Sequence, residues 1–137
     1  MNFKKNIQKI KNIFEEKKDP ESKYLALIEL GKELPPLDPK YKTSKYLIIG
    51  CQSTTYLYSY LENDLIYFKA DSNTLISKGL VALLILAYEG QKPEVIIKNK
   101  PTFLEELGIN ASLSPNRANG LHQMYKKMVE NALSFIK

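Results

Sequence analysis

The sequence predicts an α+β domain, with helices around a small three-stranded antiparallel sheet and a long helix at the end of the chain. Apolar residues recur with helical spacing in the first and last parts of the chain, and with strand-like alternation only between residues 45 and 70. The 137 residues suffice for one domain, residues 1–137, and 44% hydrophobic with 26% charged residues is ordinary for a globular chain. The strands are too few for a doubly wound α/β fold.

Two helices are predicted before the sheet. The first has one apolar face, formed by Phe3, Ile7, Ile10 and Phe14. Asp19 and Pro20 supply the cap and the first position of the second helix. Pro35 and Pro36 end it, and residues 35–44 follow as an extended connector.

Three strands are predicted, at residues 45–49, 54–61 and 65–70. The middle one alternates, which places Tyr56, Tyr58 and Tyr60 on one face. The tight turn Glu62-Asn63-Asp64 joins it to the third strand, and residues 50–53 form the loop between the first two. This loop therefore lies at an edge or tip of the sheet.

The most apolar segment, residues 75–88, is predicted to be the central core helix. Either Asp71 or Ser72 can cap its start, and Gly90 marks its C-terminal stop.

Three further helices are predicted after it. Pro93 begins one short helix, and Pro101 begins another that Gly108 ends. Ser114 and Pro115 begin the long terminal helix. Its apolar stripe comprises Ala118, Leu121, Tyr125, Met128, Ala132 and Ile136.

The charge distribution does not favour a nucleic-acid partner. The net charge is +5, but 19 of the 20 basic residues are lysine and they are interspersed with 15 acids. A dedicated nucleic-acid binder more often gathers arginine and aromatic residues on one element. No apolar stretch reaches the ~18 residues of a membrane span, and residues 1–5 lack the apolar core of a secretory signal. We therefore expect a cytoplasmic protein with neither a nucleic-acid nor a membrane partner.

Cys51 is the only cysteine of the chain. It can close no intramolecular disulfide and can build no cysteine-rich metal site alone, which leaves a buried apolar spacer or a reactive thiol. Gly50 precedes it and polar residues follow it, a pattern typical of a strand-to-turn junction where a side chain can reach solvent. An unpaired cysteine also fits a reducing cytoplasm.

Other catalytic chemistry has little support in the sequence. The only histidine, His122, falls on the terminal helix and is expected to be a surface residue rather than a base for Cys51. The sequence has no phosphate-binding loop, no metal-ligand spacing and no marked carboxylate pair, so no cofactor or metal is expected. Thiolate attack on sulfur needs only a reachable, deprotonatable cysteine and remains the best supported chemistry.

The block Gly50-Cys51-Gln52-Ser53 resembles the active-site motif of the SufE/CsdE family, the sulfur acceptors of cysteine desulfurases in iron–sulfur cluster assembly. Three further blocks resemble the family in the same order. They are Lys23 to Pro35, which includes Ile28-Glu29-Leu30-Gly31-Lys32; Asp71-Ser72 with Lys78-Gly79-Leu80-Val81-Ala82; and Leu113-Ser114-Pro115-Asn116-Arg117 with Asn119-Gly120-Leu121. The sequence departs from the family where Thr54-Thr55-Tyr56 replaces the usual Gln-Val-Trp, and at Ala70 and Asn73.

The resemblance implies a SufE-like fold and a sulfur carrier. Cys51 would take sulfur from the persulfide of a PLP-dependent cysteine desulfurase and pass it to an iron–sulfur scaffold protein, with PLP on the partner and no cofactor here. The Cys51 persulfide must be kept from stray reductants, so we expect a loop that alternates between shelter and exposure. Because the flanking residues 46–49 and 54–61 are apolar, we expect the Cys51 side chain to be mostly covered in the free protein. This interpretation favours a partner and activator of an enzyme over an independent enzyme.

Six further residues are candidates for loop support or partner contact: Gly50, Gln52, Ser53, Asp71, Lys78 and Arg117. Arg117 is the only arginine, and we expect its guanidinium to lie near residues 50–53 or Asp71 with charge-assisted bonds to them. Structural alternatives remain open: a helix cap for Asp71, a surface position for Lys78, and a structural bond to a carboxylate or to loop carbonyls for Arg117.

Two other functions remain open. One is a thiol enzyme, such as a stand-alone sulfurtransferase or a peroxidase, which the lack of a second cysteine and of a neighbouring histidine disfavours. The other is a basic interaction module with an inert buried cysteine.

Overall fold

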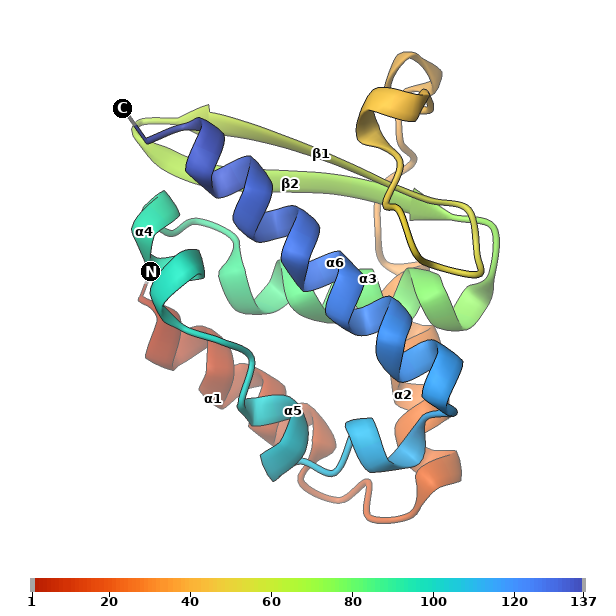
Figure 1. Ribbon diagram of the computed structural model, residues 1–137. Helices are drawn as coiled ribbons and strands as arrows, with labels where there is room; N and C mark the ends of the chain where they lie inside the picture. Colours follow the sequence, from red (N-terminus) through yellow and green to blue (C-terminus); the bar gives the residue numbers. More distant parts are fainter. Residues whose placement is uncertain (1, 137) are drawn as a thin grey trace.

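The hairpin of β1 and β2 runs along the central helix α3, and the long α6 passes obliquely in front of α3 (Figure 1). The computed structural model describes residues 2–136. Its helices and strands are α1 (Phe3–Phe14), α2 (Pro20–Lys32), β1 (Thr55–Glu62), β2 (Leu65–Ser72), α3 (Leu75–Tyr88), α4 (Pro93–Lys98), α5 (Phe103–Glu106) and α6 (Pro115–Ser134). Short 3-10 turns occupy η1 (Pro39–Tyr41), η2 (Ser44–Tyr46) and η3 (Asn110–Ser112). The α+β class and the long terminal helix are confirmed.

The sheet within the described residues has two strands, so the prediction of three is wrong. Residues 45 and 46 are taken up in η2, which leaves only an isolated bridge between Leu47 and Tyr56. On the other side of this bridge, Gly50 has φ +91°, a conformation that suits glycine, and lies in the loop that leads into β1, so the pairing does not extend there either. The predicted first strand is therefore a connector that touches the sheet at one point.

The β1–β2 hairpin follows the predicted turn. Glu62 pairs with Leu65, and both intervening residues, Asn63 and Asp64, have positive φ (54° and 65°). Two such residues match the right-handed twist of an antiparallel pair. The tyrosines of β1 lie on the outer face, where Tyr58 stacks on Tyr60 with ring centroids 5.6 Å apart.

The helix starts confirm most of the sequence prediction, with two corrections: α5 begins at Phe103 and not at Pro101, and the cap of α3 differs. Asp19 caps α2 by accepting a hydrogen bond from the Ser22 amide at 3.1 Å. The cap of α3 is Thr74, which accepts from the Ser77 amide, and not Asp71 or Ser72. Both predicted caps belong to β2 and lie too far before the first turn of the helix to bond its amides.

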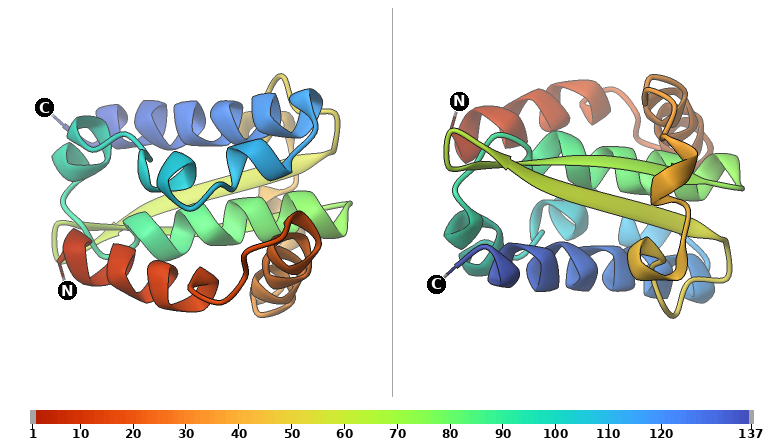
Figure 2. Two further views of the ribbon diagram at one scale, coloured as in Figure 1. Left: turned by 90° about the horizontal axis from the view of Figure 1, so that it is seen from below. Right: turned by 90° about the horizontal axis from the view of Figure 1, so that it is seen from above.

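The core is built around α3, which is buried on nearly every side; Leu75 at its first turn is an exception, with 60% exposure. Helices α1 and α2 cover one side of it, and the hairpin and α6 cover the others (Figure 2). The helices α2 and α3 touch backbone to backbone: a Cβ placed on Gly79 would lie 2.1 Å from the Leu27 carbonyl oxygen. This crossing, between Gly31 and Leu27 of α2 and Gly79 of α3, is here called the α2–α3 crossing.

The terminal helix carries the predicted stripe with two changes. Leu121, Met128 and Ala132 are buried as expected, and Met124 joins them. Ile136 lies beyond the end of the helix and is 41% exposed. Near its C-terminus, α6 is tied to β1 by a hydrogen bond of 2.7 Å from Asn131 to Ser59.

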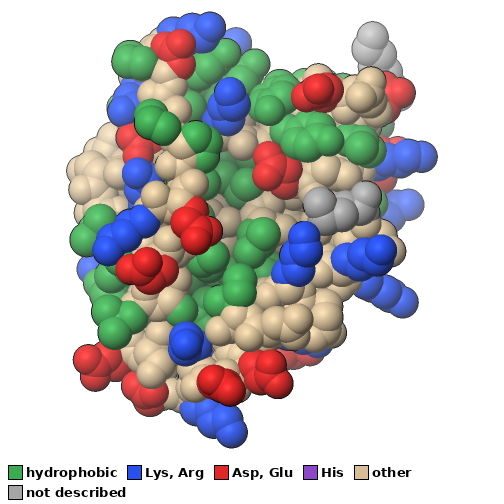
Figure 3. All heavy atoms as spheres, turned by 180° about the vertical axis from the view of Figure 1, so that it is seen from behind, with side chains coloured by type: hydrophobic (Ala, Val, Ile, Leu, Met, Phe, Trp, Pro, Cys, Tyr) green, Lys and Arg blue, Asp and Glu red, His purple; other side chains and the backbone are tan. Residues whose placement is uncertain are grey.

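Basic and acidic side chains are interspersed over much of the face drawn in Figure 3. Between residues 2 and 136, no helix combines the length and the apolar character that a membrane span requires.

Candidate functional site

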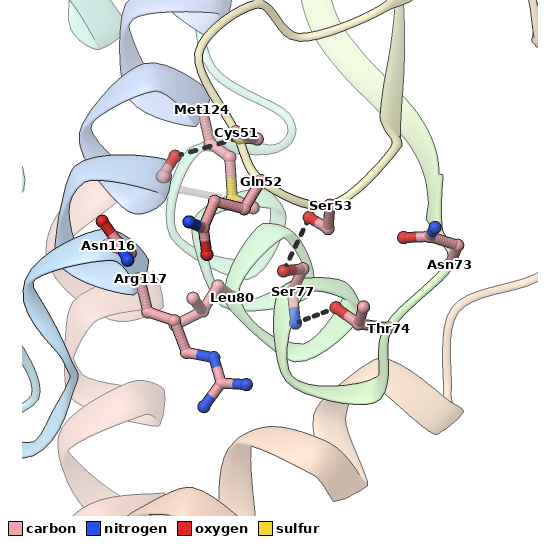
Figure 4. A pocket seen from close by; sticks show the side chains of 11 residues that line it. Cys51, Gln52, Ser53, Asn73, Thr74, Ser77, Leu80, Asn116, Arg117 and Met124 are labelled. Carbon is pink, nitrogen blue, oxygen red and sulfur yellow. Dashed lines mark hydrogen bonds between the residues drawn. The ribbon is translucent and has the colours of Figure 1, made fainter.

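The site is formed by the loop of residues 49–54, here called the Cys51 loop, which leads from the connector into β1. Buried Ile48 anchors its start by donating its amide hydrogen bond to the Thr55 carbonyl at 2.9 Å. At Gly50, a Cβ would meet the Gln123 side chain at 3.0 Å in addition to the positive φ. The turn at this glycine directs the next side chain, Cys51, toward α6 (Figure 4).

The Cys51 thiol lies against the first half of α6. Its sulfur is 3.5 Å from the Gly120 carbonyl oxygen, and the S–H group donates to that oxygen. The residue is half-buried, so the thiol is less covered than expected from the sequence.

A pocket of about 280 Å³ opens beside the sulfur, between the loop, the start of α3 and the start of α6. Leu80 and Met124 give it an apolar floor, while hydroxyl and amide groups form much of its wall (Figure 4). The lining comprises Cys51, Gln52, Ser53, Asn73, Thr74, Ser77, Leu80, Asn116, Arg117, Gly120 and Met124.

The surroundings keep the thiol protonated at rest. Burial raises the pKa of the Cys51 thiol, because the thiolate loses its hydration. Donation of the S–H to a carbonyl favours the neutral form further, since a carbonyl oxygen cannot donate to a thiolate. His122 is exposed and lines a different pocket with Lys100 and Tyr125, as expected for a surface residue. The resting site is therefore a covered thiol without a neighbouring histidine.

Side chains hold the Cys51 loop in place. Asn119 on α6 donates to the Gly50 carbonyl at 3.3 Å, and Ser53 donates to Ser77 on α3 at 2.8 Å. Thr54 and Asn73 exchange two bonds: the Thr54 amide donates to Asn73 Oδ1 at 3.0 Å, and the Asn73 amide donates to the Thr54 carbonyl at 3.1 Å. The loop is thus joined to both α3 and α6.

Asp71 and Lys78, both predicted site residues, form an ion cluster outside the pocket. Asp71 lies 2.9 Å from Lys42 of the connector and 3.6 Å from Lys78 of α3. Partial burial opposes ionisation of this carboxyl, but the hydrogen bond and charge of Lys42, with the smaller effect of Lys78, bring its pKa below the ordinary value. This cluster joins the connector to β2 and α3.

Arg117 lies beside Cys51 but does not make the predicted bonds. Its guanidinium carbon is 5.7 Å from the ring centroid of Tyr24 on α2, and Figure 4 shows the group directed away from the sulfur. Within the described residues, the ion pairs of Asp71 go to Lys42 and Lys78 instead. The expectation of charge-assisted bonds is wrong because a lysine of the connector reaches Asp71 and an aromatic ring attracts the arginine.

The remaining predicted residues lie where the sequence placed them, around the thiol. Gly50 makes the turn, Gln52 is exposed at the pocket, and Ser53 bonds to α3. Sequence reasoning missed Ser77 and Lys42. A serine in the mostly apolar segment 75–88 is the signal that could have identified Ser77. Lys42, one lysine among many, has no such signal.

Comparison with known proteins identifies relatives along most of the chain. The family model SufE, described as an Fe-S metabolism associated domain, matches residues 8–132. The cysteine desulfuration protein SufE of Wigglesworthia glossinidia brevipalpis is 36% identical over 95% of this chain and 91% of its own length. The sulfur acceptor protein CsdE of Escherichia coli is 35% identical over 88% of this chain and 83% of its own length.

A solved structure supports the fold. The solution structure of a hypothetical protein from Thermus thermophilus superposes with a TM-score of 0.77 and covers 94% of each chain, at 18% sequence identity. At that identity the likeness concerns the fold alone.

Proposed function

The chain belongs to the SufE family, and from this premise we propose that it accepts sulfur from a cysteine desulfurase, with Cys51 as the carrier. The observation that carries the proposal is the position of the one thiol, half-buried on a loop beside a pocket and bonded to the Gly120 carbonyl. A carrier must expose its sulfur to a partner and shelter it afterwards. A thiol held by loop contacts allows both.

The reaction is a thiol–persulfide exchange. The Cys51 thiolate attacks the outer sulfur of the donor persulfide; a new S–S bond forms, the S–S bond of the donor breaks, and the donor cysteine leaves as a thiolate. The proton lost by Cys51 is balanced by the one that the donor cysteine regains. No oxidant or reductant is needed, because the sulfane sulfur moves without a net change in oxidation state.

The resting geometry is unsuited to attack, so the loop must open first. In the closed loop the S–H donates to Gly120 and burial raises the pKa of the thiol. Opening breaks that bond and hydrates the sulfur, which brings its pKa toward the ordinary value of about 8.5 and presents the thiolate to the donor. We propose that the docked desulfurase stabilises the open loop.

The second half of the proposal is delivery. The loaded Cys51 would return to the closed position, where the pocket gives the outer sulfur room and limits access of small thiols. An iron–sulfur scaffold protein is the proposed recipient. We place the protein in a reducing compartment, the cytoplasm, because an unpaired acceptor thiol must stay reduced.

A stand-alone thiol enzyme has less support. Such an enzyme activates its nucleophile with a base or a cation, and the surroundings of Cys51 act in the opposite direction. No observation favours it.

The test is sulfur uptake. The protein is incubated with a cysteine desulfurase, PLP and cysteine, and its intact mass is measured before and after reduction. The proposal predicts a reducible gain of one sulfur atom on the wild type and none on Cys51→Ser, whose fold should be unchanged. A wild type that gains no sulfur from a desulfurase shown to be active, or a serine variant that still stimulates sulfide release fully, contradicts it.

A further inference from the structure

We propose that Ser77 is a positioning residue for Cys51: by accepting the hydrogen bond of Ser53, it sets how often the Cys51 loop opens in the free protein. The proposed function explains why opening of the loop matters, and the proposal rests on it for that reason alone. The contact itself links the third residue of α3 to the second residue after the thiol, at 2.8 Å.

The loop depends on such side-chain contacts because its backbone supplies few. Within the described chain, no backbone–backbone hydrogen bond joins residues 49–53 to a helix or a strand. The nearest backbone bond before this segment joins the Ile48 amide to the Thr55 carbonyl. The nearest one after it joins the Asn73 amide to the Thr54 carbonyl. The segment that holds Cys51 is therefore free to move once its side-chain bonds break.

These side-chain bonds differ in their exposure to water. The bonds from Asn119 to Gly50 and from Thr54 to Asn73 Oδ1 are exposed, so water replaces them at little cost. The Ser53–Ser77 bond is partly buried, and Ser77 has only 9% exposure. Among these contacts, the serine pair is the one whose loss leaves hydroxyl groups poorly hydrated.

The serine pair also ends a chain of hydroxyl groups. Ser53 lies 3.0 Å from Thr55, and Thr55 lies 2.8 Å from Ser72. A hydroxyl carries one proton, so Ser53, which donates to Ser77, accepts from Thr55, and Thr55 accepts from Ser72. Hydrogen bonds that run in one direction strengthen each other in a medium of low dielectric, and Thr55 is fully buried. Ser77 is the terminal acceptor of this chain.

Two consequences follow for Cys51. When the Ser53–Ser77 bond is intact, the loop is closed, the thiol donates to Gly120, and its reactivity is low. A weaker Ser53–Ser77 bond raises the fraction of molecules in which the Cys51 loop is open, and the thiol then reacts faster. It also lowers the free energy that a docked desulfurase must supply to open the loop.

The test uses two variants of nearly equal shape, Ser77→Thr and Ser77→Val, which differ by a hydroxyl against a methyl group. Cys51 is the only cysteine, so the rate of reaction with a bulky thiol reagent reports on this loop alone. We expect Ser77→Val to react about five times faster than Ser77→Thr, the ratio that one ordinary hydrogen bond provides. Ser77→Thr should stay near the wild type.

A matched control removes a similar hydroxyl elsewhere. Ser112 donates to the Gly108 carbonyl at 2.8 Å, in a partly buried turn before α6. Ser112→Ala should lower the melting temperature without the increase in labelling rate. A second variant, Ser53→Ala, removes the donor and should reproduce the effect of Ser77→Val.

Equal labelling rates for Ser77→Thr and Ser77→Val, at similar melting temperatures, overturn the proposal. So does an increase in Ser112→Ala as large as in Ser77→Val, which would assign the effect to lost stability. With an active desulfurase, Ser77→Val should reach half-maximal sulfur uptake at a lower desulfurase concentration than Ser77→Thr. Labelling uses the free protein, so a failed sulfur uptake overturns the proposed function alone, and equal labelling rates overturn the role of Ser77 alone.

Discussion

The α2–α3 crossing and the Cys51 loop are both built on α3, yet they are held by opposite means. At Gly79, α3 meets the Leu27 carbonyl of α2 with no room for a side chain. Two residues earlier, Ser77 reaches the loop through one hydroxyl beside a pocket of about 280 Å³. One helix thus provides both a fixed backbone contact and a breakable side-chain contact. The site can therefore move without movement of the scaffold.

The same substitution at a glycine of each region sharpens this contrast and gives the largest expected effect. A Cβ on Gly79 would lie 2.1 Å from a backbone oxygen, whereas one on Gly120 would meet only the Cys51 sulfur at 3.6 Å, an ordinary contact. We expect Gly79→Ala to lower the free energy of unfolding by about 3 kcal/mol, as overpacking does. Gly120→Ala should change it by less than about 1 kcal/mol, because its helix propensity improves.

Urea unfolding followed by circular dichroism measures both variants. Equal stability of Gly79→Ala and the wild type would mean that α2 and α3 can separate easily, and the contrast between the two regions would fail.

A smaller effect is expected from pH. Because burial raises the pKa of the Cys51 thiol, the folded protein favours the protonated form relative to the unfolded protein. This contribution is fully present below the pKa of the unfolded thiol, about 8.5, and is lost as pH rises through the higher pKa of the folded state. The stability of the wild type relative to Cys51→Ser should therefore fall as pH rises above about 8.5.

Using the difference from Cys51→Ser cancels the titration of lysines and tyrosines that both proteins share. A difference that stays constant or grows with pH would contradict a covered thiol.

The smallest effect is expected at Arg117. Its exposed guanidinium lies over the Tyr24 ring, and exposed contacts of this kind contribute about 0.5 kcal/mol. Arg117→Ala should lower the free energy of unfolding by about that amount, with Tyr24→Leu as the matched change on the other partner. If Arg117→Ala lowered the free energy of unfolding by several kcal/mol, Arg117 would make a buried structural bond and would belong to the rigid part of the fold.

Local patterns predicted much of the fold. The spacing of apolar residues predicted the helices, and the Asn63-Asp64 turn predicted the hairpin, because neighbours in the sequence decide these features. The segment 45–49 is apolar and was predicted to be a strand, but residues 45 and 46 belong to η2, and only Leu47 forms a bridge to β1. The pattern of apolar residues alone does not show whether a segment pairs with a neighbouring strand.

The site was predicted less completely than the fold. Gly50 and polar neighbours correctly placed Cys51 on a loop beside a strand. Lys42, Tyr24 and Ser77, which contact Asp71, Arg117 and Ser53 respectively, lie at least 24 residues away from them in the sequence. Which of many lysines, rings or hydroxyls meets each of them depends on how the helices pack, so Lys42, Tyr24 and Ser77 could not be assigned from local pattern.

The most direct test of a movable loop on a fixed scaffold is the labelling rate of Cys51 at increasing urea concentration below the unfolding transition. The account predicts a rate slower than in the unfolded protein and nearly independent of urea at low concentration, since local opening exposes little surface. Only near the transition should the rate rise steeply. A rate that rises from the first addition of urea with the slope of global unfolding, or that equals the unfolded rate in water, would contradict it.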